Sequence, residues 1–392
     1  MEDLKYDTVM VRYGELAIKS EQVRNKYEKI LIKNIEAMLD LHKIEYQEIV
    51  RERGRIYVIS EDKRAPAVIS NVFGVVSTSP VITTGPTLEE SCKVAAAIGK
   101  EVIKDGESFA INARRAGAHD FTSQDAGRKC GDAVWEAIKD RHPRVDLKNP
   151  DHEIFVEIRE ERSYIFTGVI RGTGGMPLGS QGKMVALVSG GIDSPVAAWM
   201  MMRRGCEIIP VYFNNEQYVD EAYTQKAIDT IRKLKEWSPG HDFKVYEVPH
   251  GECLRTFRER GNIRYTCVFC KRMMYKVAIE IAKKEGAHGI ITGSSLGQVA
   301  SQTSENLLIE HHGIDFPIYH PLIGLDKNEI VDMAQRIGTL DISVRPAMGC
   351  QAVPKHPAIH GRIEEIMKME SEQVDFDKMI GDALSRARIT IM

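Results

Sequence analysis

The stretch SGGIDSP, residues 189–195, constrains the fold more than any other part of the sequence. It follows the apolar segment KMVALV, which is typical of a buried strand, and precedes VAAWMMMRRG, which has helical spacing. Gly190 and Gly191 lack Cβ atoms, so the backbone can approach a ligand closely and adopt positive φ. We expect Ser194 to be the N-cap and Pro195 the first helical residue. Such a strand, turn and helix together predict a phosphate-binding site.

Asp193 is unusual beside bound phosphates, because a carboxylate repels them unless Mg²⁺ lies between. We therefore predict that Asp193 handles Mg²⁺ or pyrophosphate. The competing interpretation is an ordinary helix cap on a Gly-Gly turn. The strand and helix on either side favour the phosphate site, since isolated glycine pairs are common.

Strands and helices alternate after residue 182, which predicts an α/β domain with a doubly wound parallel sheet. The glycine-rich stretch GTGGMPLGSQG before it has linker composition. Two α+β units are expected ahead of that stretch, because their apolar periodicity changes between helical and strand spacing. We place the three domains at residues 1–64, 65–173 and 174–392.

Bulk composition excludes several classes of protein. The formal net charge of −3 gives no overall sign of nucleic-acid binding, so any RNA contact needs a local basic face. The N-terminus lacks the apolar core of a signal peptide, and no apolar stretch is long enough to span a membrane. Seven cysteines in 392 residues are too few for a disulfide framework. A cytoplasmic protein with reduced thiols is expected.

Several separated motifs resemble one family. SGGIDSP is similar to the PP-loop of ATP pyrophosphatases, which cleave ATP between the α- and β-phosphates. YGELAIKS, GTGGMPLGSQGK, TGSSLGQVASQT and PLIGLDKNEI resemble segments of tRNA 4-thiouridine synthetases of the ThiI type, over nearly the whole chain. The resemblance implies a ferredoxin-like domain, a THUMP RNA-binding domain and a PP-loop domain, in that order.

The resemblance also implies a reaction. In this family ATP adenylates the 4-oxygen of the uridine at position 8 of tRNA, and sulfide or a persulfide then displaces AMP. Lys327 matches the family's catalytic lysine, which stabilises charge on the α-phosphate, although its position after Asp326 also suits a solvated lysine. The implied ATP site contains Leu187, Val188, Ser189, Gly190, Gly191, Asp193, Ser194, Tyr212, Phe213, Lys271, Gly293 and Gln302.

Three cysteines are candidates for sulfur chemistry: Cys267 and Cys270, with two residues between them in CVFC, and the distant Cys350. They suit a [4Fe–4S] or [3Fe–4S] cluster with one open iron, which we favour. A redox pair with a persulfide carrier and unrelated buried cysteines are the alternatives. A zinc site is less convincing, because neither His356 nor His360 has suitable spacing. Many relatives carry a rhodanese-like domain with a relay cysteine, and no such segment occurs in this sequence.

The partners expected from the resemblance are tRNA, a sulfur donor (sulfide or the persulfide of a cysteine desulfurase) and a second copy of the chain. A basic cluster in the second unit is a candidate for tRNA phosphate contacts, the alternative being a solvated charged face. The cluster consists of Arg114, Arg115, His119, Arg128 and Lys129.

Two other functions compete with tRNA thiolation. One is a PP-loop enzyme that acts on another tRNA base or a small molecule, which TGSSLGQVASQT and the N-terminal half argue against. The other is a non-catalytic tRNA-binding protein with an inactive nucleotide site, which the intact Asp193 and Lys327 argue against.

Overall fold

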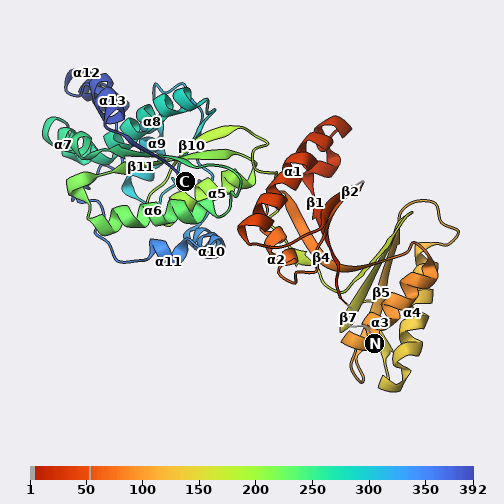
Figure 1. Ribbon diagram of the computed structural model, residues 1–392. Helices are drawn as coiled ribbons and strands as arrows, with labels where there is room; N and C mark the ends of the chain where they lie inside the picture. Colours follow the sequence, from red (N-terminus) through yellow and green to blue (C-terminus); the bar gives the residue numbers. More distant parts are fainter. Residues whose placement is uncertain (1–4, 53) are drawn as a thin grey trace. The chain divides into compact units, whose positions relative to one another are not determined.

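The computed structural model describes residues 5–52 and 54–392. The chain divides into two compact units, Met1–Gly175 and Met176–Met392 (Figure 1). The division falls within the glycine-rich stretch that the sequence predicts as a linker. Backbone hydrogen bonds hold the two ends of this stretch, from Gly74 N–H to Gly174 C=O in the first unit and from Met176 N–H to Arg203 C=O in the second.

The first unit begins with an antiparallel sheet in the order β2-β3-β1-β4. The long amphipathic helix α1 buries Leu31, Ile35 and Leu39. The elements are β1 (Thr8–Tyr13), η1 (Glu15–Ile18), α1 (Glu21–Leu41), β2 (Glu48–Glu52), β3 (Arg55–Ile59), α2 (Ala65–Ser70) and β4 (Val75–Thr84).

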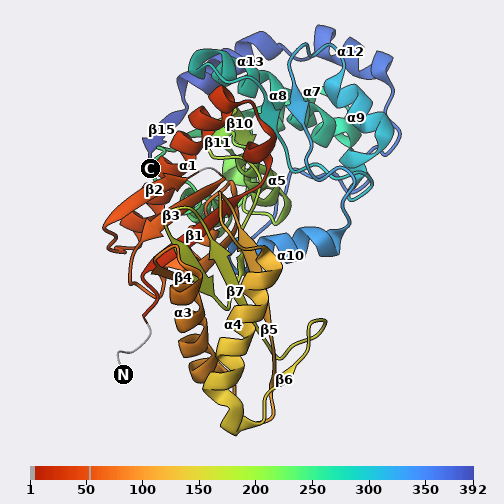
Figure 2. The same cartoon turned by 90° about the vertical axis from the view of Figure 1, so that its right-hand side faces the viewer.

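The sheet continues from β4 in the order β8-β7-β5-β6, and β9 also pairs with β4. Helices α3 and α4 pack side by side (Figure 2). Thr87 caps α3, and β7 and β8 form an antiparallel hairpin. The elements are α3 (Leu88–Val102), β5 (Ser108–Arg115), α4 (Ser123–Ile138), η2 (Lys139–Arg141), β6 (Arg144–Val145), β7 (His152–Ile158), β8 (Ser163–Phe166) and β9 (Ile170–Arg171).

The second unit contains the predicted doubly wound sheet, in the order β14-β13-β10-β11-β12-β15. All neighbouring pairs are parallel except β12 with β15. The strands are β10 (Lys183–Leu187), β11 (Glu207–Asn214), β12 (Lys244–Pro249), β13 (Ile290–Ile291), β14 (Ile318–Tyr319) and β15 (Arg388–Ile391). Since β11 and β13 flank β10 on opposite sides, the strand order reverses at β10, and ligands bind at such points in open parallel sheets.

Helices cover this sheet, with α8 and α13 contributing to the core cluster that contains Phe257 and Phe376. Helix α5 contacts both α6 and α10 in a separate group (Figure 1). The helices are α5 (Asp193–Arg203), η3 (Glu216–Tyr218), α6 (Glu221–Lys235), α7 (Gly251–Arg260), η4 (Ile263–Tyr265), α8 (Thr266–Glu285), η5 (Ala300–Gln302), α9 (Ser304–His311), α10 (Lys327–Ile337), α11 (Leu340–Ser343), α12 (Ile363–Glu372) and α13 (Phe376–Ser385).

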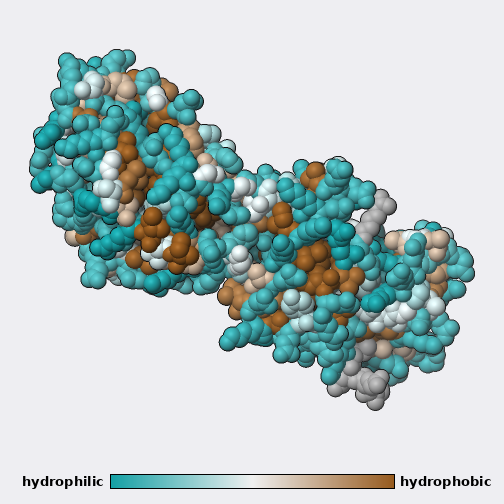
Figure 3. Space-filling model, turned by 45° about the horizontal axis from the view of Figure 1, so that its top comes forward, coloured by the Kyte–Doolittle hydropathy of each residue, from teal (hydrophilic) through white to brown (hydrophobic). Residues whose placement is uncertain are grey.

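The surface in Figure 3 shows hydrophobic patches broken up by charged and polar residues. Within the described residues, every helix is too short or too polar to cross a membrane.

Candidate active site

A cavity of 360 Å³ lies at the carboxyl ends of β10, β11 and β13. Its size is within the range of small-molecule sites. Of the residues predicted for nucleotide binding and sulfur chemistry, all but Gly190 and Lys327 line this cavity. These lining residues are Leu187, Val188, Ser189, Gly191, Asp193, Ser194, Tyr212, Phe213, Cys267, Cys270, Lys271, Gly293, Gln302 and Cys350.

The turn after β10 differs from the sequence prediction at its helix cap. Helix α5 begins at Asp193 after the N-cap Ile192, and no side chain caps it, so the prediction of Ser194 as N-cap is wrong. The hydroxyl of Ser194 instead accepts a hydrogen bond from the backbone N–H of Ser189, at 2.8 Å. Ser194 therefore closes the turn from inside the helix.

Neither Gly190 nor Gly191 adopts positive φ, contrary to the prediction. Gly190 is needed for a different reason, because a Cβ atom there would lie 2.9 Å from Cβ of Lys226 on α6. Gly293, which follows β13, faces a similar constraint. A Cβ atom at Gly293 would lie 2.7 Å from the backbone nitrogen of Ser194. The absence of Cβ atoms thus lets two neighbouring segments pack against the turn.

Asp193 and Lys327 form an ion pair beside the turn. Lys327 Nζ lies 2.6 Å from Asp193 Oδ1, and Gln298 Nε2 donates to Asp193 Oδ2 at 3.0 Å. Asp326 caps α10 through a capping box, so Lys327 stands at the first helical residue, as predicted. Both carboxylate oxygens of Asp193 therefore have a protein partner.

A second lysine, Lys271 of α8, reaches the cavity from the opposite wall. Its Nζ lies 3.4 Å from Oε1 of the buried Glu310 and 3.4 Å from Oγ of Ser294. Burial raises the pKa of Glu310 to about 7, while the charge of Lys271 acts in the opposite direction. This carboxylate was not predicted from the sequence, since only the packing of α9 on α8 brings it to Lys271.

The CVFC motif lies in the first turns of α8, which begins at Thr266. Cys267 and Cys270 are therefore three residues apart on one helix and face the same cavity. Cys350 reaches the cavity on the loop after α11. Backbone hydrogen bonds from Met348 to the Asp220 carboxylate, at 2.9 Å, and from Gln351 to the Tyr218 carbonyl, at 2.8 Å, hold that loop.

The three thiols share an environment that disfavours their charged forms. Burial raises the pKa of Cys267 to about 11 and that of Cys270 well above its usual value. Negative charge on Cys350 would raise the pKa of both thiols. The positive charge of Lys271 acts to lower the pKa of Cys267 and of Cys270. In the part of the chain that the structure describes, no three His, Cys, Asp or Glu side chains are placed to hold a single metal ion.

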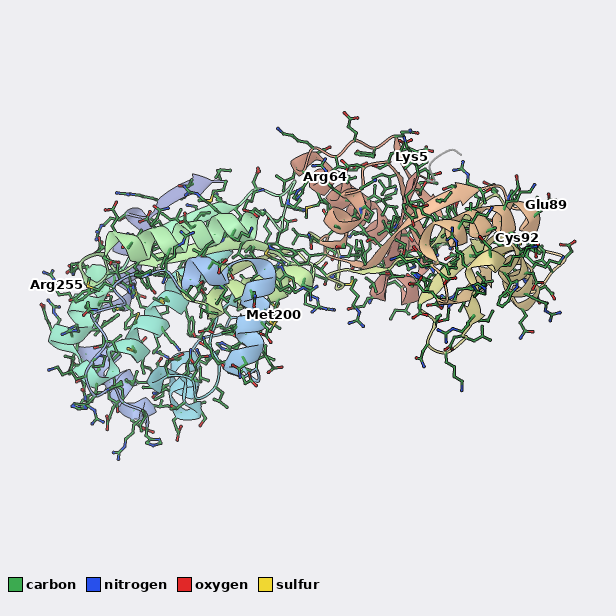
Figure 4. All side chains as sticks on the ribbon, turned by 90° about the horizontal axis from the view of Figure 1, so that it is seen from below. Lys5, Arg64, Glu89, Cys92, Met200 and Arg255 are labelled. Atoms are coloured by element: carbon green, nitrogen blue, oxygen red, sulfur yellow. The ribbon has the colours of Figure 1, made fainter. Side chains whose placement is uncertain are left out.

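The other four cysteines lie away from the cavity. Cys206 and Cys253 are buried. Cys92 of α3, labelled in Figure 4, and Cys130 of α4 pack together with their sulfur atoms 2.9 Å apart.

Tyr223 is a cavity residue that sequence reasoning missed. It lies in the first turn of α6, its hydroxyl interacts with Ser189, and burial raises its pKa. Tyr223 thus lies between Ser189, in the turn after β10, and Cys350, on the loop after α11. The signal available in the sequence was the position of α6 directly after β11, at the carboxyl edge of the sheet.

Family models match most of the chain. Residues 179–376 match the family described as thiamine biosynthesis protein (ThiI), residues 8–79 its ferredoxin-like domain, and residues 86–167 the THUMP domain. The chain belongs to the ThiI family. This confirms the resemblance and the three-domain α/β fold predicted from the motifs. The ferredoxin-like match includes α2 and the first half of β4, and the predicted domain boundaries stay predictions.

Similar ThiI-family proteins align over nearly their full length. A probable tRNA sulfurtransferase of Methanosarcina acetivorans is 54% identical over 385 residues, which cover 98% of this chain and 93% of that protein. One from Thermococcus kodakarensis is 41% identical over 373 residues, 93% of this chain and 96% of that protein. A crystal structure of a 4-thiouridine synthetase–RNA complex with bound ATP matches at a TM-score of 0.88 and 30% identity, covering 99% of this chain and 100% of that chain.

The residues predicted to contact RNA lie in the THUMP region of this ThiI-family chain. Arg114 and Arg115 end β5, and Arg128 and Lys129 lie on α4; all four are exposed. His119 lies on the connecting loop, where its Nε2 is 3.1 Å from the carbonyl oxygen of Ala116. The nearby Asp125 forms a capping box with Thr122 at the start of α4. Asp125 therefore has a structural role, and the basic side chains around it extend into solvent.

Proposed function

We propose that this chain is an ATP-dependent tRNA sulfurtransferase. It adenylates the uridine at position 8 of tRNA and replaces the 4-oxygen with sulfur, giving 4-thiouridine. The observation that carries this proposal is the single cavity in which the phosphate turn after β10 meets Cys267, Cys270 and Cys350. A nucleotide and a sulfur carrier can act on the same RNA base only if their sites are this close. The likeness to an RNA-bound and ATP-bound 4-thiouridine synthetase supports the same function.

The reaction proceeds in two displacements. The uracil O4 attacks the α-phosphorus of ATP, pyrophosphate leaves, and N3 of the base loses its proton. Sulfide, HS⁻, then adds to C4, AMP leaves with O4, and N3 regains a proton. The first displacement is needed because the oxygen of a uracil carbonyl is a poor leaving group and AMP is a good one.

The chain's own residues bind and orient the nucleotide. The turn at Ser189–Ser194 presents the N-terminus of α5 to the phosphates. Lys327 stabilises the charge that develops on the α-phosphate, and Asp193 positions Mg²⁺ or pyrophosphate. Lys271 contributes a second positive charge from α8, and Tyr212 and Phe213 frame the adenine at the end of β11.

Mass spectrometry of tRNA nucleosides after incubation with ATP, Mg²⁺ and sulfide tests this function directly. We expect 4-thiouridine at position 8 and pyrophosphate release that depends on tRNA. Pyrophosphate release without tRNA would instead indicate a small-molecule ligase, and the absence of any release would indicate a tRNA-binding protein.

For the sulfur carrier we propose an iron–sulfur cluster held by Cys267, Cys270 and Cys350. The donor set fits, since three thiols line one cavity and no fourth protein ligand is needed. Such a cluster supplies an iron atom with an open position that binds sulfide. The physiological donor is then free sulfide or the persulfide of a cysteine desulfurase, and the active assembly is a homodimer.

Anaerobic purification should give a coloured protein that contains iron and loses both colour and iron when Cys350 is replaced by serine. Iron analysis and the visible absorption spectrum measure this. Replacing Cys206, which is buried and lies away from the cavity, by serine is the control and should leave the iron content unchanged. A colourless, iron-free protein that still thiolates tRNA would refute the cluster.

Charge reversal of Arg114 and Arg115 to glutamate should weaken tRNA binding about tenfold at low salt and reduce its salt dependence, because contacts to RNA phosphates are lost. Filter binding at several salt concentrations measures both effects. Lys93→Glu on α3 is the matched control, since Lys93 is exposed and paired with Glu89 at 2.7 Å. If Lys93→Glu weakened tRNA binding as much as the reversal of Arg114 and Arg115, the RNA surface would lie elsewhere. ATP binding should be unaffected in both proteins.

A further inference from the structure

His250 is a buried histidine next to the sulfur chemistry, and the reaction described above does not use it. It follows β12 and has an exposed fraction of 0%. Its Nε2 lies 3.3 Å from Sγ of Cys270. Its backbone N–H donates to the carbonyl of Asn214 at 2.7 Å. The imidazole is thus fixed by the end of β12 and aimed at a cysteine that lines the cavity.

Aromatic rings hold the imidazole in its orientation. The ring centroid of Phe213 lies 5.3 Å from that of His250, with the two planes at 74°. The ring centroid of Phe257 lies 6.5 Å from that of His250. Because Phe213 also lines the cavity, the packing of His250 connects the end of β11 with the helix that carries Cys270.

The hydrogen bonding of the ring favours one tautomer. Among the described residues, Nδ1 of His250 is buried and has no hydrogen-bond partner. A proton on Nδ1 would leave a buried donor unsatisfied, whereas a proton on Nε2 points at the sulfur of Cys270.

We propose that His250 is a positioning residue for sulfur transfer, whose Nε2–H donates a hydrogen bond to Sγ of Cys270. This bond orients the sulfur toward the cavity and stabilises negative charge on it. The role is the same for a free thiolate and for a thiolate bound to a cluster, because both carry electron density that a buried N–H donor stabilises. The proposal rests on the proposed function, in which Cys270 takes part in delivering sulfur.

The matched variants His250→Gln and His250→Asn test this role. The side-chain amide of glutamine extends to about the position of Nε2, and that of asparagine ends near Nδ1, so only glutamine keeps a donor within reach of the sulfur. We expect His250→Asn to slow 4-thiouridine formation about tenfold, as is typical for loss of a hydrogen bond to a sulfur or metal ligand. His250→Gln should retain most of the wild-type rate.

Single-turnover pyrophosphate release separates positioning from general structural damage. It should stay within about twofold of wild type in both variants, since His250 contacts the sulfur side of the cavity and not the phosphate turn. A parallel fall of pyrophosphate release and thiolation, or equal behaviour of the two variants, would overturn the proposal.

NMR of protein labelled with ¹⁵N-histidine shows which ring nitrogen of His250 carries a proton, and it needs no activity measurement. The signals of His250 are those lost in His250→Gln, and we expect a proton on Nε2. A ring whose only proton is on Nδ1 would overturn the proposal. Wild-type protein that makes no 4-thiouridine would contradict the proposed function, and the NMR result would still decide whether the hydrogen bond exists.

Discussion

Replacing Lys327 by alanine should lower the rate of tRNA-dependent pyrophosphate release about 10²- to 10³-fold, the range found when a group that stabilises transition-state charge is removed. The ammonium of Lys327 lies 2.6 Å from Asp193, in the first turn of α5. It is therefore beside the phosphates when the turn holds ATP. Rapid-quench measurement of labelled pyrophosphate gives the rate directly.

The stability of the protein should change little in Lys327→Ala. The side chains of Lys327 and Asp193 are 45% and 24% exposed, and ion pairs in such positions contribute about 0–1 kcal/mol. Thermal unfolding checks this expectation. Lys283→Ala is the matched control, because Lys283 forms a similar exposed pair with Glu280 at 2.7 Å on α8. If the two variants released pyrophosphate at the same rate, Lys327 would be a surface lysine and its catalytic role would be wrong.

Asp193→Asn combined with Lys327→Ala shows whether the two residues act together. When two groups serve one transition state, the effect of the double change is smaller than the product of the single effects. If the double variant instead slowed pyrophosphate release by the product of the two single effects, the two residues would act independently. The ion pair in the structure would then have no bearing on catalysis.

Much of the fold and the outline of the site follow from the sequence, because both depend on local patterns. The buried strand, the glycine turn and the helix after it are contiguous, so periodicity and residue type are sufficient to predict them. The carboxyl-edge rule then brings Tyr212, Phe213 and Gly293 to the same cavity.

The details that the sequence does not predict depend on packing between distant segments. Gly190 is constrained by Lys226 on α6 and not by its own φ, which no local pattern reveals. In the sequence, Glu310 looks like an ordinary glutamate on a helix. In the structure, the packing of α9 on α8 buries its side chain next to Lys271. Ser194 would be a good N-cap in isolation, and its hydroxyl is instead used to close the turn through Ser189.

Gly293 is the position at which the smallest change should have the largest effect on nucleotide binding. A methyl group there would lie 2.7 Å from the nitrogen and 2.8 Å from the Cα of Ser194, both backbone atoms of α5. Real Cβ atoms do not approach backbone so closely, so Gly293→Ala must push the start of α5 away from the end of β13. In the proposed function the turn and the start of α5 present their N–H groups to phosphate, and this shift would move those groups out of position.

We expect Gly293→Ala to weaken ATP binding and slow pyrophosphate release by a combined factor of about 10², since a displacement of this size near reacting groups typically costs that much. Calorimetric titration with a non-hydrolysable ATP analogue, together with the release assay, measures the two contributions. Gly324→Ala is the matched control, because a Cβ atom at Gly324 meets no atom within 4 Å. Normal ATP binding in a folded Gly293→Ala protein would show that the turn tolerates the displacement, and the tight contact between β13 and α5 would then not be what shapes the phosphate site.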